Sequence, residues 1–88
     1  MRTQNNSTMK IYILVINDIE RVGYSCKGVE IFKTIEEAKE RMKELYLERC
    51  EEWDIKDPLA DGNFDYNLGS DYAYIFGEYY LDIFEKEV

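Results

Sequence analysis

The longest unbroken run of apolar residues lies near the start of the chain, where residues 10–16 read KIYILVI and all but Lys10 are apolar. Successive side chains of a β-strand point to opposite faces, and in this run both sets are apolar. Strands that are covered on both faces show this pattern, so residues 10–16 predict a central strand of a sheet. Residues 29–33 (VEIFK) predict a short second strand.

A helix is predicted to begin after Thr34. Thr34 and Glu37 are spaced as a capping box, in which the threonine hydroxyl accepts a hydrogen bond from the amide three positions later. On the opposite, solvated face, Glu37–Arg41 and Glu40–Lys43 have the spacing of ion pairs. Apolar residues recur at helical spacing as far as about residue 53, with Cys50 at the margin of their face. They are Ala38, Met42, Leu45, Tyr46 and Trp53.

The pattern then breaks. Pro, Gly, Asp and Asn are concentrated in residues 54–70, which predict a long loop. Residues 71–76 (DYAYIF) and 78–84 (EYYLDIF) predict two further strands. We expect a type II′ turn between them, centred on Gly77 and Glu78, because that turn type takes glycine at its first central position.

The order β-β-α-β-β predicts an α+β fold, in which one helix packs on one face of a small, four-stranded, mainly antiparallel sheet. We expect the strand order 2-1-3-4, with the hydrophobic first strand in the middle. Residues 1–8 are polar and without periodicity, so they predict a disordered leader before a single domain at residues 9–88. One helix covers only one face. The other face must be covered by the 54–70 loop, a second copy of the chain or a target protein.

The net charge of the chain limits the kinds of partner that it is expected to bind. The formal net charge is −8, and residues 54–88 contain nine acidic and two basic side chains. This acidity argues against direct nucleic-acid binding, which needs cationic groups at phosphate spacing. It suits either a protein partner with a basic surface or simple solubility.

Nothing in the sequence favours catalysis. The chain has no histidine and therefore lacks the commonest general base and metal ligand. It has no glycine-rich phosphate loop, nucleophile elbow or Cys-x-x-Cys pair. Oxygen-bearing residues alternate along residues 61–67 as in a calcium loop, but Tyr66 replaces the required glycine and Tyr72 the required glutamate. We predict that the protein is not an enzyme and needs no cofactor or metal.

The two predicted C-terminal strands interleave aromatic and acidic residues. Tyrosine has a broad apolar ring and a polar tip, and it is enriched at protein interfaces as well as in strands. Core packing and partner binding both account for these side chains. The candidate partner-binding residues are Asp71, Tyr72, Tyr74, Glu78, Tyr79, Tyr80 and Asp82.

Residues 9–88 resemble short proteins of phages and mobile elements in low-GC bacteria. The resemblance rests on an opening MK and apolar strand at residues 9–16, on the F-x-T-x-E-E-A helix start at residues 32–38, and on the aromatic-acidic hairpin that closes the chain. It implies a role in host takeover or in blocking a bacterial defence system. It carries no functional residue over to this chain.

The first hypothesis is therefore a non-enzymatic protein-binding module, of the kind a phage uses to inhibit a host or defence protein. One alternative is a structural homo-oligomer, such as a homodimer, in which the uncovered sheet face pairs with itself. Another is a sponge for a signalling nucleotide, with Arg21, Lys27 and Lys33 as phosphate contacts.

Cysteine usage and hydropathy bear on the cellular location. Cys26 and Cys50 are expected to be reduced thiols, as in the cytosol. No stretch has the length and hydropathy of a signal peptide or a membrane span. We expect a cytoplasmic protein, in a bacterium or a phage-infected host, without a membrane partner.

Overall fold

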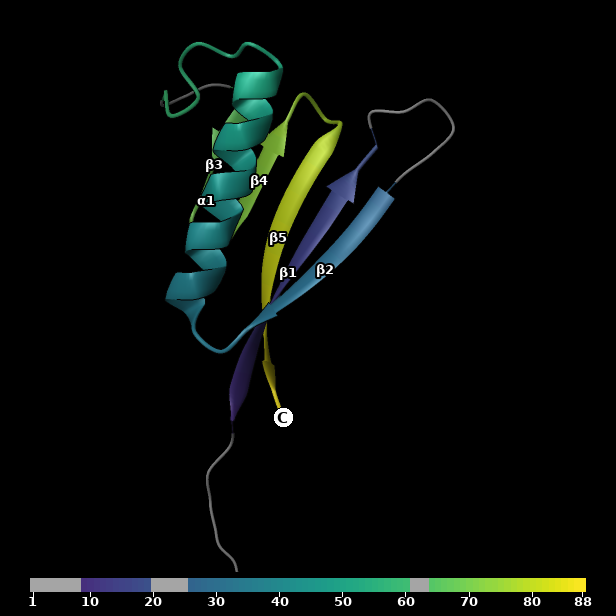
Figure 1. The fold of residues 1–88 in the computed structure, drawn as a ribbon, viewed down its shortest axis with the longest axis vertical. Coiled ribbons are helices and arrows are strands. Elements are labelled where there is room, and N and C mark those ends of the chain that lie inside the picture. Colours follow the sequence, from purple (N-terminus) through teal and green to yellow (C-terminus); the bar gives the residue numbers. More distant parts are fainter. Residues whose placement is uncertain (1–8, 20–25, 61–63) are drawn as a thin grey trace, which may run out of the picture.

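The computed structural model describes residues 9–19, 26–60 and 64–88, which form five strands and one helix. The strands make one antiparallel sheet in the order β2-β1-β5-β4-β3, and α1 lies against one face of it (Figure 1). This arrangement confirms the α+β class and an interior position for the first strand, which is the second of five. The elements are β1 (Lys10–Asp18), β2 (Cys26–Phe32), α1 (Ile35–Glu52), β3 (Tyr66–Leu68), β4 (Tyr72–Ile75) and β5 (Tyr79–Glu87).

The sheet differs from the prediction in strand number and in order. The additional strand, β3, is three residues long and lies within the stretch predicted as loop, where it pairs with β4. The strand beside β1 is β5 rather than the strand predicted at residues 71–76. β1 and β5 are both nine residues long and pair from Lys10↔Glu87 to Asp18↔Tyr79, whereas β4 has only four residues. The longer neighbour satisfies far more backbone groups of the central strand, which explains the observed order.

The turn between β4 and β5 also differs from the prediction. Its central residues are Phe76 and Gly77, with φ of 52° and 69°, and Glu78 N donates to Ile75 O at 3.0 Å. Positive φ at both central positions is the signature of a type I′ turn, whose twist matches that of the flanking strands. The predicted type II′ turn centred on Gly77 and Glu78 is therefore wrong by one residue.

The helix begins as predicted. Glu37 N donates to Thr34 Oγ1 at 3.2 Å, and the threonine hydroxyl contacts the Glu37 carboxylate at 3.2 Å. α1 ends at Glu52, and Asp54 then takes a φ of 57°, the left-handed conformation common after helix ends. The buried face differs in one detail, because Cys50 is 1% exposed. The residue predicted at the margin is therefore in the core.

The core lies between α1 and the adjacent sheet face. Leu14 at the centre of β1 is fully buried, with Tyr12 and Ile16 packed beside it. The strands β4 and β5 contribute every second residue, and the helix contributes one buried residue per turn. The buried residues in the described part of the chain are Leu14, Ala38, Met42, Tyr46, Cys50, Ala73, Ile75, Tyr79, Leu81 and Ile83. None of them is charged.

Three predictions concern residues outside the described ranges. They are the disordered leader at residues 1–8, the contribution of Arg21 to a nucleotide site, and the first positions of the calcium-like loop at residues 61–63. Within the ranges that are described, no helix combines the length and apolar character needed to cross a membrane.

Candidate partner-binding surface

The sheet face opposite α1, here called the open face, presents large apolar side chains to solvent. Strand pairing fixes its membership, because residues opposite each other on neighbouring strands share a face. Val29 and Ile31 on β2 are 60% and 62% exposed, and Phe84 on β5 is 55% exposed. Single exposed apolar residues are ordinary, but contiguous ones mark interaction sites.

The open face has two chemically different halves. On β2, β1 and β5 lies the aliphatic patch, joined by the pairs Val15↔Val29, Ile13↔Ile31 and Ile13↔Phe84. On β5 and β4 lies the acid–aromatic patch, joined by the pairs Tyr72↔Asp82 and Tyr74↔Tyr80. The aliphatic patch consists of four aliphatic side chains and the aromatic ring beside them: Ile13, Val15, Val29, Ile31 and Phe84. The acid–aromatic patch consists of Tyr72, Tyr74, Tyr80 and Asp82.

Two tyrosines of the acid–aromatic patch, Tyr72 and Tyr74, are held in place by their neighbours. The rings of Tyr72 and Tyr74 stack with their centroids 6.3 Å apart and an interplanar angle of 7°. Asn67 Nδ2 donates to the Tyr72 hydroxyl at 3.3 Å, and the ring lies directly over Gly69. A partner would therefore meet a partly ordered aromatic surface and would lose less side-chain entropy on binding.

Asp82 occupies an unfavourable electrostatic position within this patch. Burial among its neighbours raises the pKa of the Asp82 carboxyl, and repulsion from Asp71 raises it further. Across strands, Asp82 is flanked by Val15 and Tyr72. No cation of the described part of the chain lies within ion-pair distance of it. A cation brought by a partner would relieve both effects.

The structure gathers most of the predicted site residues but not all of them. Asp71 lies just before β4, where its carbonyl accepts a hydrogen bond from Ile83 N at 2.9 Å. Glu78 is exposed in the β4–β5 turn. Tyr79 needs a correction, because it is 4% exposed and its ring lies 4.1 Å from the Arg49 guanidinium on the α1 side. Strand alternation places it on the opposite face from Tyr80, so it does not belong to the surface.

The aliphatic patch is the part of the surface that the sequence prediction missed. The alternation of Ile13 and Val15 did predict a second apolar face for the first strand. Val29 and Ile31 alternate in the same way in the second strand, and this signal could have placed them on that face.

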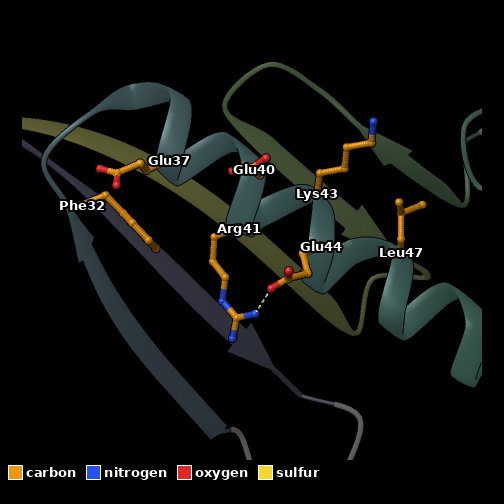
Figure 2. Close-up of a pocket in the computed structure, with 7 residues that line it drawn as sticks. All are labelled: Phe32, Glu37, Glu40, Arg41, Lys43, Glu44 and Leu47. Atoms are coloured by element: carbon orange, nitrogen blue, oxygen red, sulfur yellow. Dashed lines mark hydrogen bonds and ion pairs between the residues drawn. The ribbon is translucent and has the colours of Figure 1, made fainter.

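A shallow groove lies on the outer side of α1, beside β2 (Figure 2). Its arginine is already engaged: Arg41 makes two contacts with the Glu30 carboxylate, at 3.0 and 3.3 Å, and also pairs with Glu44. These hydrogen bonds raise the pKa of Arg41 and tie the helix to β2. Arg41 thus pairs with Glu30 and Glu44 rather than with the predicted Glu37. The residues lining the groove are Phe32, Glu37, Glu40, Arg41, Lys43, Glu44 and Leu47.

Residues outside the open face bear on three other possibilities: a reactive thiol, a metal site and a nucleotide site. Cys50 is a free, buried thiol, and burial raises its pKa, which disfavours the nucleophilic thiolate. Within the described ranges, no cluster of acidic or cysteine side chains is arranged to hold a metal ion. Of the proposed nucleotide contacts, Lys27 belongs to β2, and Lys33 is exposed directly after that strand.

Comparison with protein-family models, with curated proteins and with solved structures finds no match to this chain.

Proposed function

We propose that this protein is a binding module that docks a protein partner with a basic surface onto its acid–aromatic patch. The observation that supports the proposal most directly is the position of Asp82, a carboxylate beside exposed tyrosines with no cation of the described residues within ion-pair distance. Burial and the charge of Asp71 both disfavour its ionised form. A lysine or arginine of a partner would stabilise that form and would be held there in return.

The tyrosines provide contact area for a partner, which a single charged group does not provide. Tyr72 and Tyr80 are 41% and 36% exposed; Tyr72 lies opposite Asp82 on the neighbouring strand, and Tyr74 lies opposite Tyr80. Tyrosine and tryptophan dominate binding energy at interfaces because they bury a large area and lose few torsional degrees of freedom. Arginine also stacks on aromatic rings, so the patch suits arginine better than lysine.

The charge of the whole chain acts at longer range. Residues 54–88 contain nine acidic and two basic side chains, and both strands of the acid–aromatic patch belong to this segment. A field of one sign increases the rate of association with a surface of the opposite sign, and salt reduces the effect. The resemblance to phage and mobile-element proteins makes a nuclease or nucleic-acid-binding complex of a bacterial defence system the first class of target to test.

The test is a pull-down with the tagged chain from lysates of low-GC bacteria that carry diverse defence systems, followed by mass spectrometry. Three baits are compared: the natural chain, Asp82→Lys and Glu51→Lys. The last variant makes the same charge change on the exposed side of α1, away from the open face. We expect a stoichiometric partner that moderate salt releases, that Glu51→Lys retains and that Asp82→Lys loses.

Two results would contradict the proposal. If Glu51→Lys weakened capture as much as Asp82→Lys, the effect would reflect net charge rather than the patch. If a captured partner were indifferent to Asp82→Lys and to Tyr80→Ala, that partner would bind elsewhere on the chain.

A further inference from the structure

A second groove lies farther along α1, between the helix and the segment that follows it. Its volume is about 570 Å³, which is within the range of small-molecule sites. Its apolar lining includes the half-buried side chains of Leu47 on the helix and of Ile55 and Pro58 after it. Hydrogen bonds hold the two walls together, because Ile55 N donates to Cys50 O at 2.8 Å and the Tyr46 hydroxyl donates to Pro58 O at 2.6 Å. The groove is therefore part of the fold and needs no ligand to form it.

The rim of this groove is acidic. Its charged lining residues are four exposed carboxylates: Glu44, Glu48, Glu51 and Asp54. Glu44 pairs with Arg41, whereas no cation of the described residues lies within ion-pair distance of the other three. The groove also lies at the C-terminal end of α1, where the partial negative charge of the helix dipole adds to that of the carboxylates. A positively charged ligand would therefore gain electrostatic energy in this groove.

We infer that this groove binds a polyamine, a small organic cation in which two or more ammonium groups are joined by methylene chains. The methylene groups would cover the apolar lining, and the ammonium groups would contact the carboxylates of the rim. Glu44 and Glu48 are one helical turn apart, about 6 Å along the axis. Ordinary bond lengths place the two nitrogen atoms of an extended butane-1,4-diamine about 6 Å apart as well. A divalent metal ion fits less well, because it requires several oxygen atoms around one point, and no group of acidic side chains in the described ranges is arranged in this way.

This site is separate from the acid–aromatic patch. α1 covers one face of the sheet, and the patch lies on the other face (Figure 1). A polyamine in the groove therefore does not compete with a protein on the patch, and the inference does not rest on the proposed function. Because the carboxylates of the rim are exposed, salt screens them, and we expect a dissociation constant of about 0.1–1 mM for a polyamine with three charges.

The experiment is a titration of the full chain with spermidine at physiological ionic strength, followed by the amide signals in nitrogen–proton NMR correlation spectra. We expect saturable shifts of the signals from residues 44–56, with little change in β4 and β5. Glu51→Lys should weaken spermidine binding about tenfold or more, because it places a like charge on the rim. Asp82→Lys is the matched control, since it makes the same charge change on the opposite face of the sheet. It should bind spermidine as the natural chain does, and magnesium chloride at the same ionic strength should not reproduce the shifts.

The inference fails if spermidine causes no saturable shift up to about 10 mM, a concentration well above the expected dissociation constant. It also fails if Asp82→Lys weakens binding as much as Glu51→Lys does, or if magnesium produces the same shifts, because either result would indicate a general attraction to the acidic chain. The same spectra show whether each variant is folded. Capture of a protein partner is tested separately, and there the roles are reversed: Asp82→Lys is expected to lose the partner and Glu51→Lys to retain it.

Discussion

Arg49 Nη2 lies 2.8 Å from Asp18 Oδ2, and this ion pair joins the last turn of α1 to the end of β1. The two side chains are only 16% and 21% exposed, so solvent screens the pair little. The same guanidinium lies 4.1 Å from the ring centroid of Tyr79 and 5.2 Å from that of Trp53. One arginine thus connects the helix with both central strands of the sheet.

We expect Arg49→Met to lower the free energy of unfolding by about 2–3 kcal/mol. The substitution removes the guanidinium charge beside the largely buried Asp18 carboxylate, and it also removes the contacts of that guanidinium with two aromatic rings. Urea denaturation at neutral pH measures the effect. Lys43→Met is the control, since this exposed residue of the same helix should change stability by less than about 0.5 kcal/mol. Equal effects of the two substitutions would show that the ion pair contributes nothing.

A hydrogen bond from a buried side chain of α1 holds the segment after the helix. Tyr46 is fully buried, and its hydroxyl donates to Pro58 O at 2.6 Å. We expect Tyr46→Phe to cost about 1–2 kcal/mol, because the ring still fills its place but the hydrogen bond to the carbonyl is lost. Cleavage by trypsin after Lys56 should accelerate as well.

Tyr80→Phe is the control for that prediction, because it removes a hydroxyl from an exposed ring of the open face. It should leave both stability and the rate of cleavage after Lys56 nearly unchanged. If Tyr46→Phe also left stability and the rate of cleavage unchanged, the segment would be held by other contacts.

The parts of the fold that the sequence predicted well are those with local causes. Thr34 and Glu37 are three residues apart, and their hydrogen bond forms within one turn, so the helix start could be predicted from the sequence. The first strand was equally clear, because its two apolar faces are a property of the run itself. In both cases the neighbours along the chain determine the structure.

The parts that the sequence did not predict depend on distant residues. The order of β4 and β5 depends on which strand matches the length of β1, a comparison between segments more than sixty residues apart. The turn was misplaced by one residue because Phe76 adopts a positive φ, which bulky residues seldom do. That conformation is accompanied by stacking on Trp53, with centroids 6.0 Å apart. Tyr79 was misassigned for the same reason. The alternation along the strand predicts that Tyr79 and Tyr80 lie on opposite faces of the sheet, but it does not predict which of these faces the helix covers.

The acid–aromatic patch can be perturbed without substituting any of its members. A Cβ atom at Gly69 would lie 2.4–2.9 Å from atoms of the Tyr72 ring, so Gly69→Ala must displace this ring from its stack on Tyr74. We expect the fold to persist, with a loss of about 1 kcal/mol because the exposed ring can move. Partner binding should weaken to a level between the natural chain and Tyr72→Ala, as measured by titration calorimetry.

Gly28→Ala provides a matched control in the same sheet. A Cβ atom at Gly28 would lie 3.6 Å from the Ile16 side chain, which is an ordinary contact distance. This variant should bind the partner as the natural chain does. If Gly69→Ala also bound with full affinity, the position of the Tyr72 ring would be irrelevant to recognition.

The ionised Asp82 carboxylate should destabilise the folded state, although it is proposed to contribute to partner binding. Its pKa is raised in the folded chain by burial and by Asp71, so the folded state holds the proton more tightly than the unfolded state does. Stability linked to this group is therefore fully present below the unfolded pKa of about 3.9 and is lost as the pH rises through the higher folded value. At neutral pH the ionised carboxylate is a net cost to the fold.

Asp82→Asn removes that charge, so it should raise the midpoint of thermal unfolding at pH 7, and the gain should vanish at a pH below about 3.9, where both side chains are neutral. Asp57→Asn, which removes an exposed carboxylate from the segment after α1, should change the midpoint little at pH 7. Calorimetric scans from acid to neutral pH measure both variants. A gain that persisted in acid would have a cause other than charge.

Because a partner's cation is proposed to stabilise this same carboxylate, Asp82→Asn should also weaken partner binding. One substitution would then make the fold more stable and the module less effective, as is common when a binding site retains an unfavourable charge.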